Sequence, residues 1–135
     1  MAYVEWSDDF DVSNKTLNDQ HKMLFDYIND YDQAFADEAG LGTMSEIFDK
    51  IVSYAAMHFE QEEAYMESVG YPGIKSHKHI HEQLVARVLE YKKQLAGGDR
   101  LVMKEIRLFL KNWLTGHIKG IDTKYAQHAA HNDAA

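Results

Sequence analysis

The stretch Met57-His58-Phe59-Glu60-Gln61-Glu62-Glu63 places a histidine and a glutamate four residues apart. On an α-helix, residues at this spacing lie on the same face, one turn from each other. The face that carries His58 and Glu62 continues with apolar residues on both sides, among them Ile51 and Tyr65. We therefore expect the imidazole and the carboxylate to point into a protein core. A buried carboxylate is costly unless it is paired or bound to a metal ion, so the stretch indicates a polar site inside the protein.

The same helical spacing of apolar residues recurs three more times along the chain. The patterns run from Ser13 or Asn14 to near Gly40 and Gly42, from the capping-box sequence Thr43-Met44-Ser45-Glu46 to Gly70, from the turn Gly70-Tyr71-Pro72-Gly73 to Gly97 and Gly98, and from Asp99 to about Gly120. Because short turns join them, they predict an all-α fold, an up-down-up-down antiparallel four-helix bundle. We expect residues 1–135 to form one domain, with an N-terminal arm at 1–14 and a C-terminal tail at 123–135.

Polar residues interrupt the apolar face of each predicted helix, early in the first and third and late in the second and fourth. They are His21, His58, Glu62, His77, His81 and His117. In an antiparallel bundle all these positions lie at one end. A single inward histidine is more often a hydrogen-bonded core residue than a ligand. Six such groups at one level cannot satisfy one another easily, and each unpaired buried group costs about 1–3 kcal/mol. Metal ligation removes this conflict, so we predict a metal site.

Asp122 follows His117 by five residues, which on a regular helix is about 140° around the axis. It can join the site only if the backbone is distorted between the two. We predict a kink or break over residues 119–121, where Gly120 makes distortion easiest.

These donors comprise five imidazoles and two carboxylates, too many for one ion but suited to two ions bridged by the carboxylates. Imidazole-rich sites suit iron, zinc, copper or nickel better than magnesium or calcium. A single zinc ion would leave three donors unused. The Glu-x-x-His pairs of many four-helix diiron enzymes do not occur in this chain. With fewer anionic ligands to stabilise high-valent iron, the site favours reversible ligand binding over substrate oxidation.

The complete set, His21, His58-x-x-x-Glu62, His77-x-x-x-His81 and His117-x-x-x-x-Asp122, resembles the hemerythrins, in particular the single-domain bacterial ones. The resemblance spans nearly the whole chain and includes Asn18-Asp19-Gln20-His21-Lys22 and Trp113-Leu114-Thr115-Gly116-His117-Ile118. It implies a non-haem site of two iron ions that binds dioxygen reversibly. By this likeness His77, His81 and His117 hold a coordinatively full iron, and His21 and His58 hold the iron that keeps a place for dioxygen. Glu62 and Asp122 bridge both irons, together with an oxo or hydroxo group.

Five apolar residues next to these ligands resemble the dioxygen pocket of the family, although they would serve equally as bundle core: Leu24, Phe59, Trp113, Leu114 and Ile118. The resemblance implies a carrier, store or delivery protein for oxygen rather than an enzyme, with an oxygen-consuming protein as recipient. The alternatives are a diiron redox enzyme or an oxygen or redox sensor that uses the same site. Iron storage is a third class of function. The sequence shows no additional acidic pathway for iron, so it does not support that class.

The remaining features limit partners and location. The chain has 22 acidic and 14 basic residues, a net charge of -8, which disfavours nucleic acid and anionic membranes as partners. It has no cysteine and no long apolar run, so we expect no disulfide, no membrane insertion and a cytoplasmic location. We expect His79, Glu60 and Glu63 to be solvated, and His128 and His131 to lie in the tail.

Overall fold

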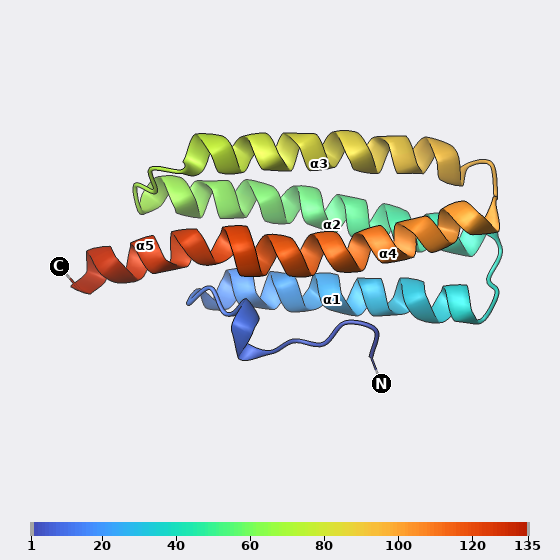
Figure 1. Cartoon of the computed structure of the whole chain (residues 1–135), viewed down its shortest axis with the longest axis horizontal. Coiled ribbons are helices and arrows are strands. Elements are labelled where there is room, and N and C mark those ends of the chain that lie inside the picture. The colour runs from blue at the N-terminus through green and yellow to red at the C-terminus, as the bar shows by residue number, and fades with distance from the viewer. Residues whose placement is uncertain (1, 135) are drawn as a thin grey trace.

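The protein forms a bundle of four long helices lying side by side (Figure 1). The structure, a computed structural model, describes residues 2–134 and the side chains of residues 2–130. Its helices are η1 (Asp8–Phe10), α1 (Lys15–Ala36), α2 (Leu41–Ser68), α3 (Ile74–Leu95), α4 (Arg100–His117), η2 (Ile118–Asp122) and α5 (Thr123–Ala134). α1 and α3 each contact both α2 and α4, and successive helices run in opposite directions. The predicted up-down-up-down antiparallel bundle is confirmed.

The N-terminal arm packs on α1 and α4, as its aromatic residues predict. Trp6 and Phe10 contact the ring of Phe25 in α1, with centroids 6.1 and 5.0 Å from it. The backbone of Val4 forms two hydrogen bonds of 2.9 Å with the Asn29 side chain. The arm ends where Asn14 caps α1 by accepting a hydrogen bond from the Leu17 amide, the cap expected from the sequence.

The turn between α1 and α2 differs from its prediction. α1 ends at Ala36, before the glycines, and the left-handed residue after it is Glu38, at φ 58°. α2 begins at Leu41 after Gly40, so the predicted capping box at Thr43 lies inside the helix and is wrong. Arg100 donates hydrogen bonds to the carbonyl oxygens of Phe35, at 2.7 Å, and Ala39, at 2.6 Å. The Arg100 side chain, at the start of α4, thus caps the C-terminal end of α1, which the local sequence leaves without a cap.

At the other end of α4 the chain does not pass into a tail. Ile118–Asp122 forms a π-helical turn, in which the Thr123 amide donates to the Ile118 carbonyl five residues earlier, and α5 then continues to Ala134. The predicted distortion between His117 and Asp122 is confirmed in this form. α5 packs against the end of α2 through His128, whose Nε2 lies 3.1 Å from the Val69 carbonyl oxygen. The His131 side chain and residue 135 lie outside the described part of the chain.

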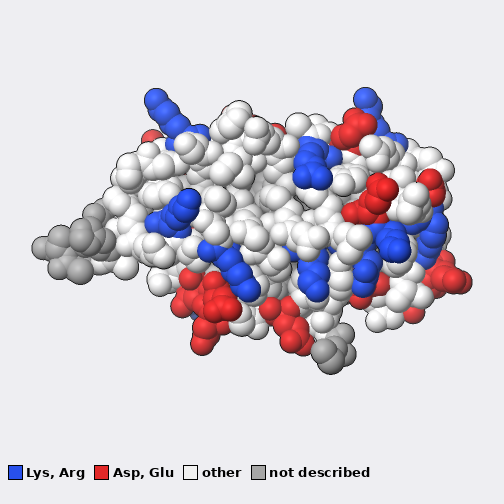
Figure 2. All heavy atoms as spheres, viewed as in Figure 1, with Lys and Arg blue, Asp and Glu red and all other residues white. Residues whose placement is uncertain are grey.

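Surface charge and hydropathy bear on the predicted partners. Figure 2 shows basic side chains scattered among acidic ones on the face drawn, without one continuous basic surface. Among the described helices, none combines the length and the apolar composition needed to cross a membrane. The expected lack of a nucleic-acid partner and the cytoplasmic location stay predictions.

Candidate metal centre

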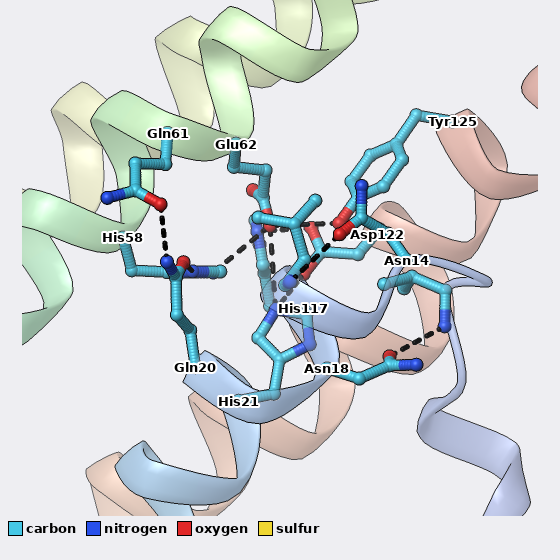
Figure 3. A network of polar contacts seen from close by, with 12 residues as sticks. Asn14, Asn18, Gln20, His21, His58, Gln61, Glu62, His117, Asp122 and Tyr125 are labelled. Carbon is cyan, nitrogen blue, oxygen red and sulfur yellow. Dashed lines mark hydrogen bonds and ion pairs between the residues drawn. The ribbon is translucent and has the colours of Figure 1, made fainter.

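All seven predicted metal ligands are buried and meet at one end of the bundle. Figure 3 shows Glu62 descending from α2 toward His21, His117 and Asp122, which belong to α1, α4 and the π-helical turn. His77 and His81 enter from the first two turns of α3. The side chains of His21, Glu62 and Asp122 have no solvent exposure. Because α1 and α3 start at this end and α2 and α4 finish there, the antiparallel topology alone brings these positions to one level.

The Glu62 carboxylate has one oxygen on each side of the centre. Oε2 lies 3.5 Å from His21 Nε2 and 3.1 Å from His58 Nε2. Oε1 lies 3.0 Å from His77 Nε2 and 3.1 Å from His81 Nε2. The two oxygens thus divide the histidines into two groups.

Asp122 makes the same division from the opposite side. Its Oδ2 lies 3.2 Å from His21 Nε2, whereas Oδ1 lies 3.1 Å from His77 Nε2 and 2.9 Å from His117 Nε2. The donor atoms thus form two sets, and within each set all atoms lie within 4.8 Å of one another. One set comprises His77, His81 and His117, the other His21 and His58, and both share Glu62 and Asp122. The π-helical turn is what brings Asp122 over His117 from five residues away.

Several of these buried atoms have no hydrogen-bond partner among the described residues. They are both ring nitrogens of His21, Nδ1 of His77, Nε2 of His81 and of His117, and both carboxylate oxygens of Asp122. The short nitrogen–oxygen distances above therefore mostly lack hydrogen-bond geometry, as expected when donor atoms point at a common centre rather than at each other. So many unsatisfied buried atoms would be costly in a purely structural core. The donor set fits a cluster of metal ions.

The charges of the site are strongly coupled. Burial raises the pKa of Glu62, but contacts with His21, His58, His77 and His81 outweigh it and hold that pKa well below its usual value. Burial lowers the pKa of His21 and of His77, but their contacts with Asp122 and Glu62 outweigh it and raise each pKa to about 9. Two ionised carboxylates thus attract positive charge to the centre, which a cation also supplies.

Three further polar residues contact the centre from outside, and sequence reasoning missed them. Gln20 lies with its Oε1 2.7 Å from His58 Nδ1, and Glu63 with its Oε2 3.0 Å from His81 Nδ1. The Tyr125 hydroxyl donates a 3.1 Å hydrogen bond to Glu62 Oε2. The expectation that Glu63 is solvated is therefore wrong, whereas Glu60 and His79 are exposed as expected. For Tyr125 a signal existed: it lies three residues after Asp122, one helical turn away, if the helix continues.

Aromatic and apolar groups surround the histidines. Phe59 stacks on His81, with ring centroids 3.9 Å apart, and Trp113 stacks on His117 at 5.0 Å. A cavity of about 90 Å³ extends from here along the bundle core, lined only by apolar side chains that include Leu24, Phe59, Trp113 and Leu114. Ile118, the fifth predicted pocket residue, is fully buried but is not among those lining this cavity.

Comparison with known proteins agrees with this architecture. The family model of the hemerythrin HHE cation binding domain matches residues 12–129, and the chain belongs to the hemerythrin family. It is 35% identical to a bacteriohemerythrin of Stenotrophomonas maltophilia over 93% of this chain and 81% of that protein. It is 33% identical to a bacteriohemerythrin of Methylococcus capsulatus, over 93% and 95% of the two chains. A crystal structure of wild-type hemerythrin superimposes with a TM-score of 0.83 at 25% identity, over 96% of this chain and 99% of that one.

Proposed function

We propose that this hemerythrin-family protein binds dioxygen reversibly at two iron ions, as an oxygen carrier, store or delivery protein. The observation that carries the proposal is the position of the two carboxylates of Glu62 and Asp122. Each carboxylate turns one oxygen toward one group of histidines and its other oxygen toward the second group. A single ion would need one such group and leave the other unsatisfied. In the proposal His77, His81 and His117 would hold one iron, His21 and His58 would hold the other, and the carboxylates of Glu62 and Asp122 would supply donors to both.

The unequal numbers of histidines support an open position for the ligand. Three imidazoles and two carboxylates supply five donors to one ion, but only four donors reach the other. When bound, two ferrous ions supply the two electrons that dioxygen accepts on binding and returns on release. The open position would lie on the side of His21 and His58.

The apolar cavity supports a small uncharged ligand. None of the side chains that line it carries an ionisable group. Leu24 and Leu114, each 2% exposed, lie along the cavity one turn from His21 and His117, and they keep water from this side of the centre. An apolar pocket that supplies no acid slows the proton-assisted loss of reduced oxygen, which is the reaction that would make binding irreversible.

Tyr125 supplies the one phenolic hydroxyl in hydrogen-bond contact with the centre in the described structure. Burial, followed by the nearby charges of Glu62 and Asp122, raises the pKa of Tyr125 far above its usual value. Its proton therefore stays on the phenol at any physiological pH, and the hydroxyl acts as a fixed donor that orients the bridging carboxylate of Glu62.

Cycles of anaerobic reduction, exposure to oxygen and removal of oxygen under vacuum test the proposal. A carrier returns to the colourless diferrous form over several cycles, and metal analysis gives two irons per chain. Prompt irreversible oxidation with release of peroxide would instead favour the alternative of a diiron redox enzyme or a sensor. Zinc, or one ion per chain, would overturn the diiron site.

A further inference from the structure

The two candidate metal positions differ in the groups behind their histidines. His58 contacts the neutral amide of Gln20, whereas His81 contacts the carboxylate of Glu63. His58 and His81 present Nε2 to opposite oxygens of Glu62, so each is the imidazole through which an outer group reaches its own metal position. The two metal positions thus differ in the residues that contact the outer ring nitrogens of their histidines.

The Gln20 amide is held in one orientation by its neighbours. Gln20 is 6% exposed, and its Nε2 donates a 2.6 Å hydrogen bond to Oε1 of Gln61, as Figure 3 shows between α1 and α2. The Gln61 amide in turn donates to the sulfur of Met57 at 3.1 Å. With its amide nitrogen engaged by Gln61, Gln20 turns its oxygen to His58 Nδ1. That nitrogen must carry the proton, which leaves Nε2 free to bind a metal ion.

Glu63 acts on His81 in the same place but with a full charge. Its side chain is 27% exposed and accepts from His81 Nδ1 at 3.0 Å, while Phe59 covers the ring face of His81. An imidazole that donates to a carboxylate is a stronger electron donor than one that donates to an amide, because the carboxylate draws the proton and leaves more charge on the ring. Stronger donation stabilises the oxidised metal ion.

From these contacts we propose that Gln20 and Glu63 are positioning residues that set unequal reduction potentials at the two irons. The iron held through His81 is easier to oxidise, and the iron held through His58, where the ligand is expected, is kept ferrous. This inference rests on the proposed diiron function. It assigns the difference to two side chains that are not ligands themselves.

Two near-isosteric substitutions test it by moving the charge. Glu63→Gln should raise the reduction potential of the iron held through His81, and Gln20→Glu should lower the reduction potential of the iron held through His58. Either change therefore brings the two one-electron potentials closer together in a spectroelectrochemical titration. We expect at least a tenfold change in the ratio of oxidised to reduced iron at fixed potential, about 59 mV for a one-electron step. Glu60→Gln and Gln83→Glu, which make the same charge changes at exposed positions, are the matched controls.

The wild-type protein separates failure of this inference from failure of the proposed function. If wild type binds two irons and returns oxygen, but both variants titrate like their controls, the asymmetry is overturned and the function stands. If wild type does not load two irons, the function itself fails. For a variant that does not load, proton NMR of the zinc-loaded wild type gives an independent readout. Protected Nδ1 protons on His58 and His81, with that of His81 further downfield, are expected, and equal shifts would overturn the inference.

Discussion

The two ends of the bundle are made from the same four helices but have opposite chemistry. Where α1 turns into α2 and α3 into α4, the core is apolar and includes Met44, Leu95 and Met103. Its one buried phenol, Tyr31, donates a 2.9 Å hydrogen bond to the Met103 carbonyl and leaves nothing unsatisfied. The opposite end buries the seven candidate ligands and the Tyr125 phenol, and several of these ligands have no hydrogen-bond partner among the described residues. The apolar end gains free energy by folding alone, whereas the polar end recovers its cost only when a cation binds.

Glu62→Ala should have the largest effect, because among the described residues Glu62 is the only side chain with contacts to four of the five candidate histidine ligands. Without the bridge, the His21 and His58 position retains only those two histidines and Asp122, and we expect the iron content to fall from two per chain to one or fewer. Metal analysis after reconstitution measures this. Glu60→Ala, at an exposed position two residues earlier, is the control. Two irons per chain in Glu62→Ala would contradict its role as a bridge.

A matched pair of leucines separates stability from oxygen chemistry. Leu95 at the apolar end and Leu114 beside the histidines are each 2% exposed, but only Leu114 lines the cavity. Leu95→Ala should lower the free energy of unfolding by about 2–5 kcal/mol, the usual cost of a buried leucine, and leave oxygen cycling unchanged. Leu114→Ala should admit water and hasten irreversible oxidation of the ferrous form. Urea unfolding and the rate of oxidation in air measure the two effects.

Two results would contradict this comparison between Leu95 and Leu114. If Leu95→Ala hastened oxidation as much as Leu114→Ala, loss of stability alone would explain both. An unaltered oxidation rate in Leu114→Ala would argue against a role for Leu114 in guarding the site.

Tyr125→Phe should have a smaller effect at the polar end. It removes the hydrogen bond to Glu62 but keeps the ring that packs against Tyr65, with centroids 5.8 Å apart. A buried hydrogen bond to a charged group contributes about 1.5–3 kcal/mol, so we expect a loss of that order in the stability of the metal-loaded protein. Two irons should still bind, but a chelator should remove them faster. Tyr65→Phe is the control, and equal release rates in both variants would show that Tyr125 does not orient the carboxylate.

The two ends also differ in what the sequence could predict. The meeting of the candidate ligands at the polar end followed from helical spacing and antiparallel order, because both depend only on the positions of residues such as His21, His58 and His77 along the chain. The turn at the apolar end did not, because Arg100 caps α1 from 65 residues away. Glu63 was misjudged for a related reason: at the edge of a helix face a carboxylate either stays in water or reaches an adjacent helix, and only the position of His81 decides which.

The smallest expected effect tests the reason given for the distortion at Asp122. Glycine was expected to be the residue that permits it, yet Gly120 has no positive φ, and a methyl group added there would meet nothing within 4 Å. The π-helical turn therefore does not depend on glycine. Gly120→Ala should stabilise the protein by about 0.5–1 kcal/mol, because alanine loses less backbone entropy in a helix, and iron loading should stay at two. Thermal unfolding and metal analysis measure both. If the variant instead loses iron, glycine is needed at position 120 to bring Asp122 into the site. The contacts of the Asp122 carboxylate would then not suffice to hold the π-helical turn.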